Sequence, residues 1–254
     1  MGRLDGRVAV VTGASRGIGR TIAETLAREG AAVVIAARTE QQRGARLPGT
    51  IYEVAEGICA VGGRALAVPC NVADEDSIQA MADRVHRELG PVDLVVNNAA
   101  VQVPGSLREV QVRHWDLAFR VNVRGPLLVG RAFLDDMLAK RFGHVINVSS
   151  IAATRDRPGN VHYSVTKAAL ERLSTGWAAE LREANVAVVA LKPAGAVDTP
   201  GLRFGGRYDH PELLPGPEQM AAATVVLAAQ EPLACTGLVV SDEEVLARFT
   251  HRAG

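Results

Sequence analysis

Residues 8–36 follow the order strand, glycine-rich turn, helix, strand, and this order restricts the fold more than any other feature of the chain. Val8–Thr12 is a short apolar run rich in β-branched residues, as in a strand buried on both faces. The turn Gly13-Ala-Ser-Arg-Gly17-Ile-Gly19 follows, then apolar residues at helical spacing and a second apolar run at 32–36. Glycines let a backbone approach a pyrophosphate, and the N-terminus of the next helix attracts its charge. The stretch predicts a βαβ unit that binds a dinucleotide, against the simpler alternative of a tight turn without a ligand.

The remaining residues continue the alternation of strands and helices, without repeats or linkers. Further strands are predicted at 64–69, 94–97, 145–148, 186–191 and 237–240. Helices are predicted at 51–61, 74–89, 115–122, 126–140, 163–181, 221–229 and 243–249, with a kink near Gly125-Pro126. The segment 200–217 is rich in glycine and proline and is interpreted as a mobile lid. The pattern predicts one α/β domain over 1–254, a doubly wound Rossmann-type fold with a mostly parallel seven-stranded sheet flanked by helices.

Composition restricts the partners and the compartment. The 28 basic and 28 acidic residues give a formal net charge of zero, so the sequence predicts binding neither to nucleic acid nor to a membrane. Cys59, Cys70 and Cys235 are scattered and form no metal-binding or disulfide pattern. No signal segment precedes the first strand and no run of 18 apolar residues occurs, so a cytoplasmic protein without a metal is expected.

Tyr163 and Lys167 are spaced i, i+4, which places both side chains on one face of a helix. A cation beside a phenol favours the phenolate and lowers the tyrosine pKa, so that the hydroxyl can exchange a proton near neutral pH. Ser149 and Ser150 follow the apolar run 145–148, which is typical of a buried strand. Ser150 therefore lies at the carboxyl end of a strand, where ligands bind in an open α/β sheet. The alternative is an ordinary amphipathic pair on a helix surface, because such spacing also arises by chance.

The spacing Gly13-x3-Gly17-x-Gly19 resembles that of the short-chain dehydrogenase/reductase family. The resemblance extends in order to Asn97-Asn98-Ala99-Ala100, and to Asn122, Ser150, Tyr163 and Lys167, which match a catalytic tetrad. It implies hydride transfer between a nicotinamide and an alcohol or carbonyl. In this interpretation Tyr163 is the general acid/base, Ser150 polarises the substrate oxygen, Lys167 holds the ribose, and Asn122 anchors a water molecule.

The resemblance also implies a set of cofactor contacts. They are Gly13, Ser15, Arg16, Gly17, Ile18, Gly19, Arg38, Asn71, Val72, Asn98, Ala99, Tyr163, Lys167, Pro193, Val197 and Thr199. Ala37 stands where an acidic residue would grip the ribose hydroxyl of NAD, and Arg16 and Arg38 can clamp a 2′-phosphate, so NADP(H) is expected over NAD(H). The alternative is that both arginines are solvated. One extra residue after Pro193 leaves the path of that turn open.

Residues 47–63 and 236–244 resemble the hydroxysteroid dehydrogenase-like and citronellol dehydrogenase-like members, which points to a small hydrophobic substrate. A second hypothesis is reduction of a 3-oxoacyl thioester, or oxidation of a 3-hydroxyacyl thioester, which Arg203 and Arg207 keep open. A third is a nucleotide-sensing protein without turnover, which the intact tetrad opposes. Many family members are dimers or tetramers, so a homo-oligomer, such as a homotetramer, is expected through the helices 126–140 and 164–181.

Overall fold

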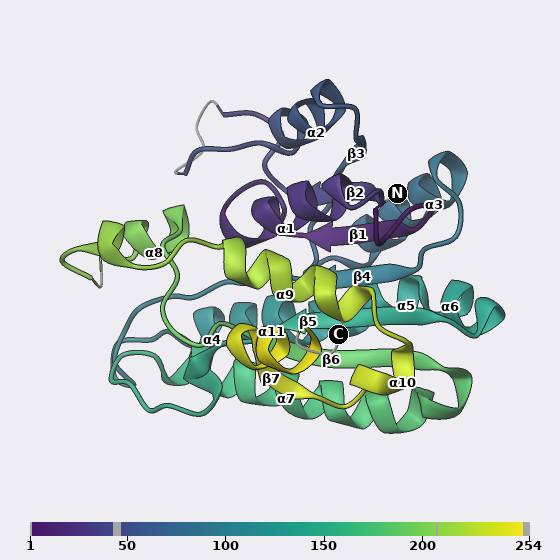
Figure 1. Cartoon of the computed structure of the whole chain (residues 1–254). Helices are drawn as coiled ribbons and strands as arrows, with labels where there is room; N and C mark the ends of the chain where they lie inside the picture. The colour runs from purple at the N-terminus through teal and green to yellow at the C-terminus, as the bar shows by residue number, and fades with distance from the viewer. Residues whose placement is uncertain (1, 43–46, 207, 251–254) are drawn as a thin grey trace.

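The computed structural model describes residues 2–42, 47–206 and 208–250 (Figure 1). Within them, seven strands form one sheet in the order β3-β2-β1-β4-β5-β6-β7. The strands are β1 (Val8–Thr12), β2 (Ala32–Ala37), β3 (Arg64–Pro69), β4 (Leu94–Asn97), β5 (Gly143–Val148), β6 (Val186–Lys192) and β7 (Val239–Ser241). Every neighbouring pair is parallel, which confirms the predicted doubly wound sheet.

Helices connect the strands and cover both faces of the sheet (Figure 1). They are α1 (Gly17–Arg28), α2 (Ile51–Ala60), α3 (Glu75–Glu88), α4 (Val112–Phe119), the π-helical turn η1 (Arg120–Arg124), α5 (Gly125–Ala132), α6 (Leu134–Lys140), α7 (Val161–Leu181), α8 (Pro200–Phe204), α9 (Glu218–Ala228), α10 (Pro232–Cys235) and α11 (Asp242–Thr250). Short 3-10 turns lie at η2 (Ile151–Ala153), η3 (Arg182–Ala184) and η4 (Pro211–Leu213). None of the helices in the described ranges is long and apolar enough to cross a membrane.

Alternate residues of each strand enter two separate hydrophobic cores. Val11 and Ile35 pack with α1, α2, α9 and α11 on one face of the sheet. Val10 and Val34 pack with α3, α5, α6 and α7 on the other face. Because both faces are covered, the strands are apolar throughout rather than alternating with polar residues. This is why the short apolar runs identified the strands in the sequence.

The strand order places a topological switch point between β1 and β4, where the chain moves to opposite sides of the sheet. In open α/β sheets, ligands bind outside the carboxyl ends of the strands at such a point. The residues that follow β1, β4, β5 and β6 therefore gather at one edge of the molecule.

The helical stretch is interrupted next to Gly125-Pro126, as predicted, and the interruption takes the form of a π-helical turn. Helix α5 begins at Gly125 and includes Pro126 in its first turn, directly after helical residues, so the missing N–H of Pro126 removes the i+4 donor of the Asn122 carbonyl. The π-helical turn spans Arg120–Arg124, and a second break follows at Phe133, where α5 ends and α6 begins. The sequence also gave no indication of the short helices α8 and α10. The other predicted boundaries differ from the structure by three residues or fewer.

Candidate active site

The glycine-rich turn lies against the segment that follows β4. Gly13 has a φ of +66°, and a Cβ there would lie 2.8 Å from the Cα of Ala99. A Cβ at Gly19 would collide with Nδ2 of Asn98 and with the carbonyl of Gly13. Larger residues would therefore force the two segments apart. The glycines thus allow the turn and the β4 segment to form one narrow floor at the switch point.

Thr12 and Asn98 hold that floor together. The hydroxyl of Thr12 accepts hydrogen bonds from the backbone amides of Asn98 and Ala99, each at 3.1 Å. In return, Nδ2 of Asn98 donates to the carbonyls of Thr12 at 2.9 Å and Gly13 at 3.2 Å. Asn98 is therefore a structural clamp between β1 and β4 as well as a wall of the cavity beside it.

The N-terminus of α1 faces this floor and suits an anion. Its N-cap residue is Arg16, no side chain caps it, and its first turn contains no acidic residue. The first backbone N–H groups and the positive end of the helix dipole can therefore meet a negatively charged group. A cavity of about 380 Å³ adjoins this end, lined by Gly13, Ser15, Gly17, Asn71 and Val72 among others. The donors, the glycine cradle and the space fit the pyrophosphate of a dinucleotide.

Arg16 and Arg38 both line this cavity, together with Ala37. The guanidinium of Arg16 donates to the hydroxyl of Thr39 at 2.9 Å and to the carbonyl of Gly49 at 3.0 Å. Partial burial, and then the positive charge of Arg38, lower the pKa of Arg16. Since no described carboxylate forms an ion pair with either guanidinium, the two cations form a place that an additional anion would stabilise.

A second and larger cavity, of about 880 Å³, opens next to the first. Ser150, Tyr163 and Lys167 all line it, so residues from the end of β5 and from α7 meet as the sequence predicted. Every one of the sixteen predicted cofactor contacts lines one of the two cavities, and Ile18, Asn98 and Thr199 line both. The structure therefore brings the whole predicted set together.

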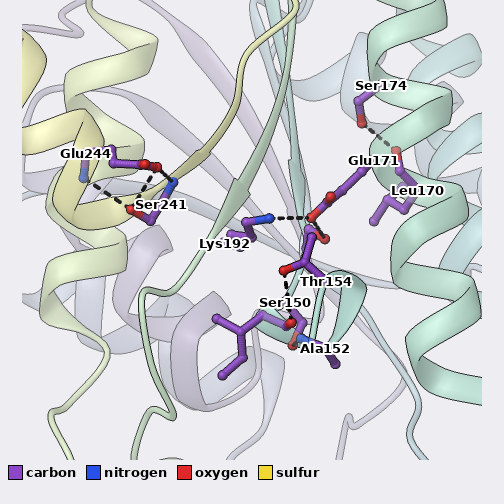
Figure 2. Close-up of polar contacts among 11 residues, drawn as sticks. Ser150, Ala152, Thr154, Leu170, Glu171, Ser174, Lys192, Ser241 and Glu244 are labelled. Carbon is purple, nitrogen blue, oxygen red and sulfur yellow. Dashed lines mark hydrogen bonds and ion pairs between the residues drawn. The ribbon is translucent and has the colours of Figure 1, made fainter. Parts of the chain in front are cut away.

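Lys167 is 2% exposed, and its ammonium donates to the carbonyl of Val148 at 2.7 Å. The Nζ atom lies 5.6 Å from the centre of the Tyr163 ring. Burial lowers the pKa of Lys167 to about 8, partly opposed by the negative charge of Glu171. Ser150 lies at the start of η2, where its hydroxyl accepts a bond of 3.2 Å from the amide of Ala152 (Figure 2). The hydroxyl hydrogen of Ser150 is therefore left to donate elsewhere.

Asn122 is fully buried within the π-helical turn. Its Oδ1 accepts from the amide of Val101 at 2.8 Å, and its Nδ2 donates to the carbonyl of Val101 at 2.9 Å and to Thr166 at 3.0 Å. The side chain thus joins α7 to the segment after β4. Pro126, four residues later, has no N–H, so the Asn122 carbonyl lacks the usual i+4 helix donor.

Among the described residues, no group of three or more His, Cys, Asp or Glu side chains could hold a metal ion. The model of the short chain dehydrogenase family matches residues 7–204. This chain belongs to the short-chain dehydrogenase/reductase family. The match, together with the parallel sheet, confirms the resemblance that the glycine spacing and the tetrad indicated.

Similar proteins agree with this family assignment. Human hydroxysteroid dehydrogenase-like protein 2 is 34% identical over 253 residues, which cover 96% of this chain and 58% of that protein. The chain thus spans 58% of the length of that curated relative. A metagenomic short-chain oxidoreductase solved in complex with NADP has a TM-score of 0.79 and 33% identity, over 94% of this chain and 98% of that one. A gluconate 5-dehydrogenase from Burkholderia cenocepacia, in complex with NADP and tartrate, has a TM-score of 0.82 and 29% identity, over 94% of each chain.

A side chain that the sequence did not reveal holds the turn after β6. Asp242, 4% exposed at the start of α11, accepts a bond of 2.9 Å from the amide of Ala194. Thr199, at the other end of the turn, caps α8 by accepting from the amide of Leu202 at 3.1 Å. Pro193, Val197 and Thr199 consequently all reach the large cavity.

The segment after η2 and described residues of the segment 200–217 both line the large cavity. Arg157 donates to the hydroxyl of Tyr208 at 3.0 Å, and its guanidinium lies 5.1 Å from the centre of the Tyr208 ring. Arg203 is paired with Asp198 through two bonds of 2.6 Å. Arg207, the other arginine named for the thioester hypothesis, lies outside the described residues.

Proposed function

We propose that this chain is an NADP(H)-dependent oxidoreductase that acts on a hydrophobic secondary alcohol, ketone or aldehyde. The observation that carries the proposal is that Ser150, Tyr163 and Lys167 line one cavity, next to the crevice of the glycine-rich turn. A hydroxyl donor, a phenol and a cation in one cavity support the proposal, because a carbonyl that accepts a hydride needs a hydrogen-bond donor and a proton. Retention of all three groups also argues against a nucleotide-sensing protein without turnover.

The nicotinamide of the bound cofactor would supply or accept the hydride. In the reducing direction, Ser150 donates a hydrogen bond to the substrate oxygen, and the Tyr163 hydroxyl delivers a proton to that oxygen as negative charge develops there. The ammonium of Lys167, buried 5.6 Å from the Tyr163 ring, stabilises the phenolate that is left. In the oxidising direction Tyr163 takes the proton back.

Asn122 enters this proposal mainly through its backbone. Both polar atoms of its side chain are bonded to Val101 and Thr166. A water molecule near Lys167 would therefore meet the Asn122 carbonyl, which Pro126 cannot reach with a donor. The side chain, for its part, fixes α7 against the wall of the cavity.

The preference for NADP(H) is supported by charge. Ala37 offers no carboxylate to repel a 2′-phosphate, and Arg16 and Arg38 bring two guanidiniums to the same end of the smaller cavity. A guanidinium pair is matched by a phosphate dianion better than by a ribose hydroxyl. Two of the solved relatives are complexes with NADP, which agrees with this choice.

The substrate class follows from the lining of the larger cavity. Val101, Pro104, Ile151, Leu202 and Phe204 contribute apolar surface around the reacting groups. Phe204, in α8, lines this cavity and is 62% exposed, which is consistent with our proposal that 200–217 is a lid. Acyl thioester substrates remain the second candidate, but Asp198 already pairs with Arg203, so this described arginine offers a carrier phosphate little free charge.

We also propose that the chain forms a homo-oligomer, a dimer or tetramer, through α5, α6 and α7. Val161 and Val165 are 44% and 39% exposed on α7, so this helix offers apolar surface that a second copy of the chain would cover. Sedimentation at micromolar concentration tests this part separately, and a monomer would refute it.

The function is tested by following nicotinamide absorbance with matched substrates and both cofactors. Apolar ketones, a gluconate-like polyol and a 3-oxoacyl thioester should be compared with NADPH and with NADH. We expect turnover of the apolar ketones, with a higher kcat/KM for NADPH than for NADH. Turnover restricted to the thioester would favour the second candidate, and turnover only with NADH would refute the cofactor assignment.

A further inference from the structure

A partly buried ion pair adjoins the elements that carry the candidate catalytic groups. The carboxylate Oε1 of Glu171 accepts a hydrogen bond of 2.8 Å from the hydroxyl of Ser149 and one of 3.1 Å from the ammonium of Lys192. The side chains of Glu171 and Lys192 are only 12% and 16% exposed. Figure 2 shows Lys192 reaching across from its strand towards Glu171 on α7. The family motifs in the sequence include neither Glu171 nor Lys192.

This single carboxylate joins the three elements that carry the site. Glu171 lies one helical turn after Lys167 on α7, at the i, i+4 spacing that places both on one face. Ser149 directly precedes Ser150 at the end of β5, and Lys192 ends β6 directly before Pro193. A change at Glu171 therefore reaches the proton donor helix, the polarising hydroxyl and the turn beside the nicotinamide position together.

The charged groups around Lys167 affect its protonation. Its ammonium is completely buried and is bonded to a neutral carbonyl, that of Val148, rather than to a carboxylate. Burial lowers its pKa to about 8, and the negative charge of Glu171 acts in the opposite direction. The neighbouring elements present Lys192 on β6 and Glu244 on α11, whose pKa is lowered by hydrogen bonds from Ser241 and further by Lys192. Positive and negative groups thus alternate outward from the site.

We propose that Glu171, with Lys192 as its counter-ion, is a positioning residue of this active site, which sustains the positive charge of Lys167 and fixes Ser149 so that Ser150 faces the substrate oxygen. The inference rests on the proposed function, because it assigns the pair to the reaction. A buried ion pair is by itself weak evidence of stabilisation, since apolar residues of similar volume often replace such pairs without loss. The pair is assigned to the reaction because Glu171 contacts Ser149, which precedes Ser150, and lies on the same helix as Lys167.

The chain offers a direct measurement, because it contains only three lysines, Lys140, Lys167 and Lys192. Protein labelled with ¹³C at the lysine Cε can be titrated by NMR without any ligand, and a Lys167→Met sample assigns the resonance. Glu171→Gln keeps the shape and an acceptor for Ser149 but removes the charge. We expect the titration midpoint of Lys167 to fall by about one pH unit in this variant.

Lys192→Met provides the opposite perturbation. It leaves the Glu171 carboxylate without its counter-ion, so more of its negative field acts on Lys167, and the midpoint should rise by about half a pH unit. The matched control is Glu88→Gln, which removes the acid of an exposed helical pair with Arg84 and should leave the midpoint unchanged. A purely structural ion pair would give reduced stability in both site variants and no opposite shifts.

NADPH affinity gives a second readout, which separates a loss of charge on Lys167 from a distortion of the site. If the midpoint falls from about 8 to about 7, the protonated fraction of Lys167 at pH 8 falls from one half to about one tenth, so binding should weaken about fivefold. At pH 6 Glu171→Gln and wild type should bind alike, whereas a distorted site would bind weakly at both pH values. If Glu171→Gln does not fold, the direction of the Lys192→Met shift decides.

Equal midpoints in wild type and both site variants, or shifts in the same direction, would overturn the inference. Failure of the proposed function has a different signature: the wild type would bind no NADPH at any pH, while the lysine titration would still report the coupling between Glu171 and Lys167. The two outcomes are therefore distinguishable.

Discussion

Replacing Lys167 with methionine should stabilise the protein at neutral pH, although it removes a candidate catalytic group. Folding buries the ammonium, and its pKa falls from 10.5 to about 8. At about 1.4 kcal/mol per pKa unit, the charged form therefore costs the folded state roughly 3 kcal/mol below pH 8. Methionine keeps an unbranched chain of similar length in the helix but loses the bond to Val148, worth about 1–2 kcal/mol. The variant should be more stable by about 1–2 kcal/mol at pH 7.

The pH dependence gives this prediction its sharpest form. Between pH 8 and 10.5 the unfolded wild-type chain holds a proton on Lys167 that the folded chain has released. Since the unfolded state then binds more protons, the free energy of unfolding of the wild type rises with pH, by about 1.4 kcal/mol per unit from this group. The advantage of Lys167→Met should shrink through this window and change sign at about pH 9, with wild type the more stable protein at pH 10.

Urea unfolding at pH 7, 8, 9 and 10, followed by circular dichroism, measures the difference between the two proteins. Lys140→Met is the control, because it removes a lysine that is 34% exposed and paired with Asp93 while leaving Lys167 intact. The free energy of unfolding of Lys140→Met should therefore rise with pH relative to that of Lys167→Met, as it does for the wild type. A stability difference between wild type and Lys167→Met that is constant from pH 7 to 10 would refute the reasoning about burial.

Three further predictions concern the cofactor, the turn and the lid. Arg38→Asp should weaken NADPH binding by about 2–4 kcal/mol, or roughly 30- to 1,000-fold, and shift preference towards NADH. The exposed control Arg87→Asp should change neither the NADPH affinity nor the preference. An unchanged kcat/KM with NADPH in Arg38→Asp would exclude a phosphate site formed by Arg16 and Arg38. Gly19→Ala should lower the free energy of unfolding by about 1–3 kcal/mol, because its Cβ would collide with Asn98. In the control Gly57→Ala the Cβ meets nothing within 4 Å, so the free energy of unfolding should rise by about 0.5–1 kcal/mol. Equal effects of the two substitutions in urea unfolding would contradict the steric argument. Amides of the described residues within 200–217 should exchange hydrogen faster than those of β5 in the ligand-free protein, and equal protection would count against a lid.

The strands and the cofactor turn could be predicted from the sequence because their signals are local. A strand covered on both faces is apolar at every position, and the burial of all five residues of Val8–Thr12 shows why that run was recognisable. The close approach of Gly13 to Ala99 is a backbone requirement that only glycine meets, so it is also visible as a residue type.

The features that the sequence did not reveal depend on contacts between distant segments. The π-helical turn at Asn122 accompanies bonds to Val101 and Thr166, which lie 21 and 44 residues away. A helical pattern shows an apolar stripe and a proline, so it predicts an interruption near Pro126 but not the π-helical geometry. Glu171 likewise belongs to an ordinary helical surface until β6 brings Lys192 to it.

Transfer of deuterium in Tyr163→Phe tests the central claim most directly. Wild type and variant would each be mixed with NADPH deuterated at the transferring position and one ketone that the wild type reduces. Mass spectrometry follows deuterium in the alcohol, and fluorescence measures NADPH affinity separately. We predict equal affinity and a rate of transfer about 10²–10⁴-fold lower in the variant, because only the general acid is lost. A variant that transfers deuterium at the wild-type rate would remove Tyr163 from the reaction and contradict the proposed mechanism.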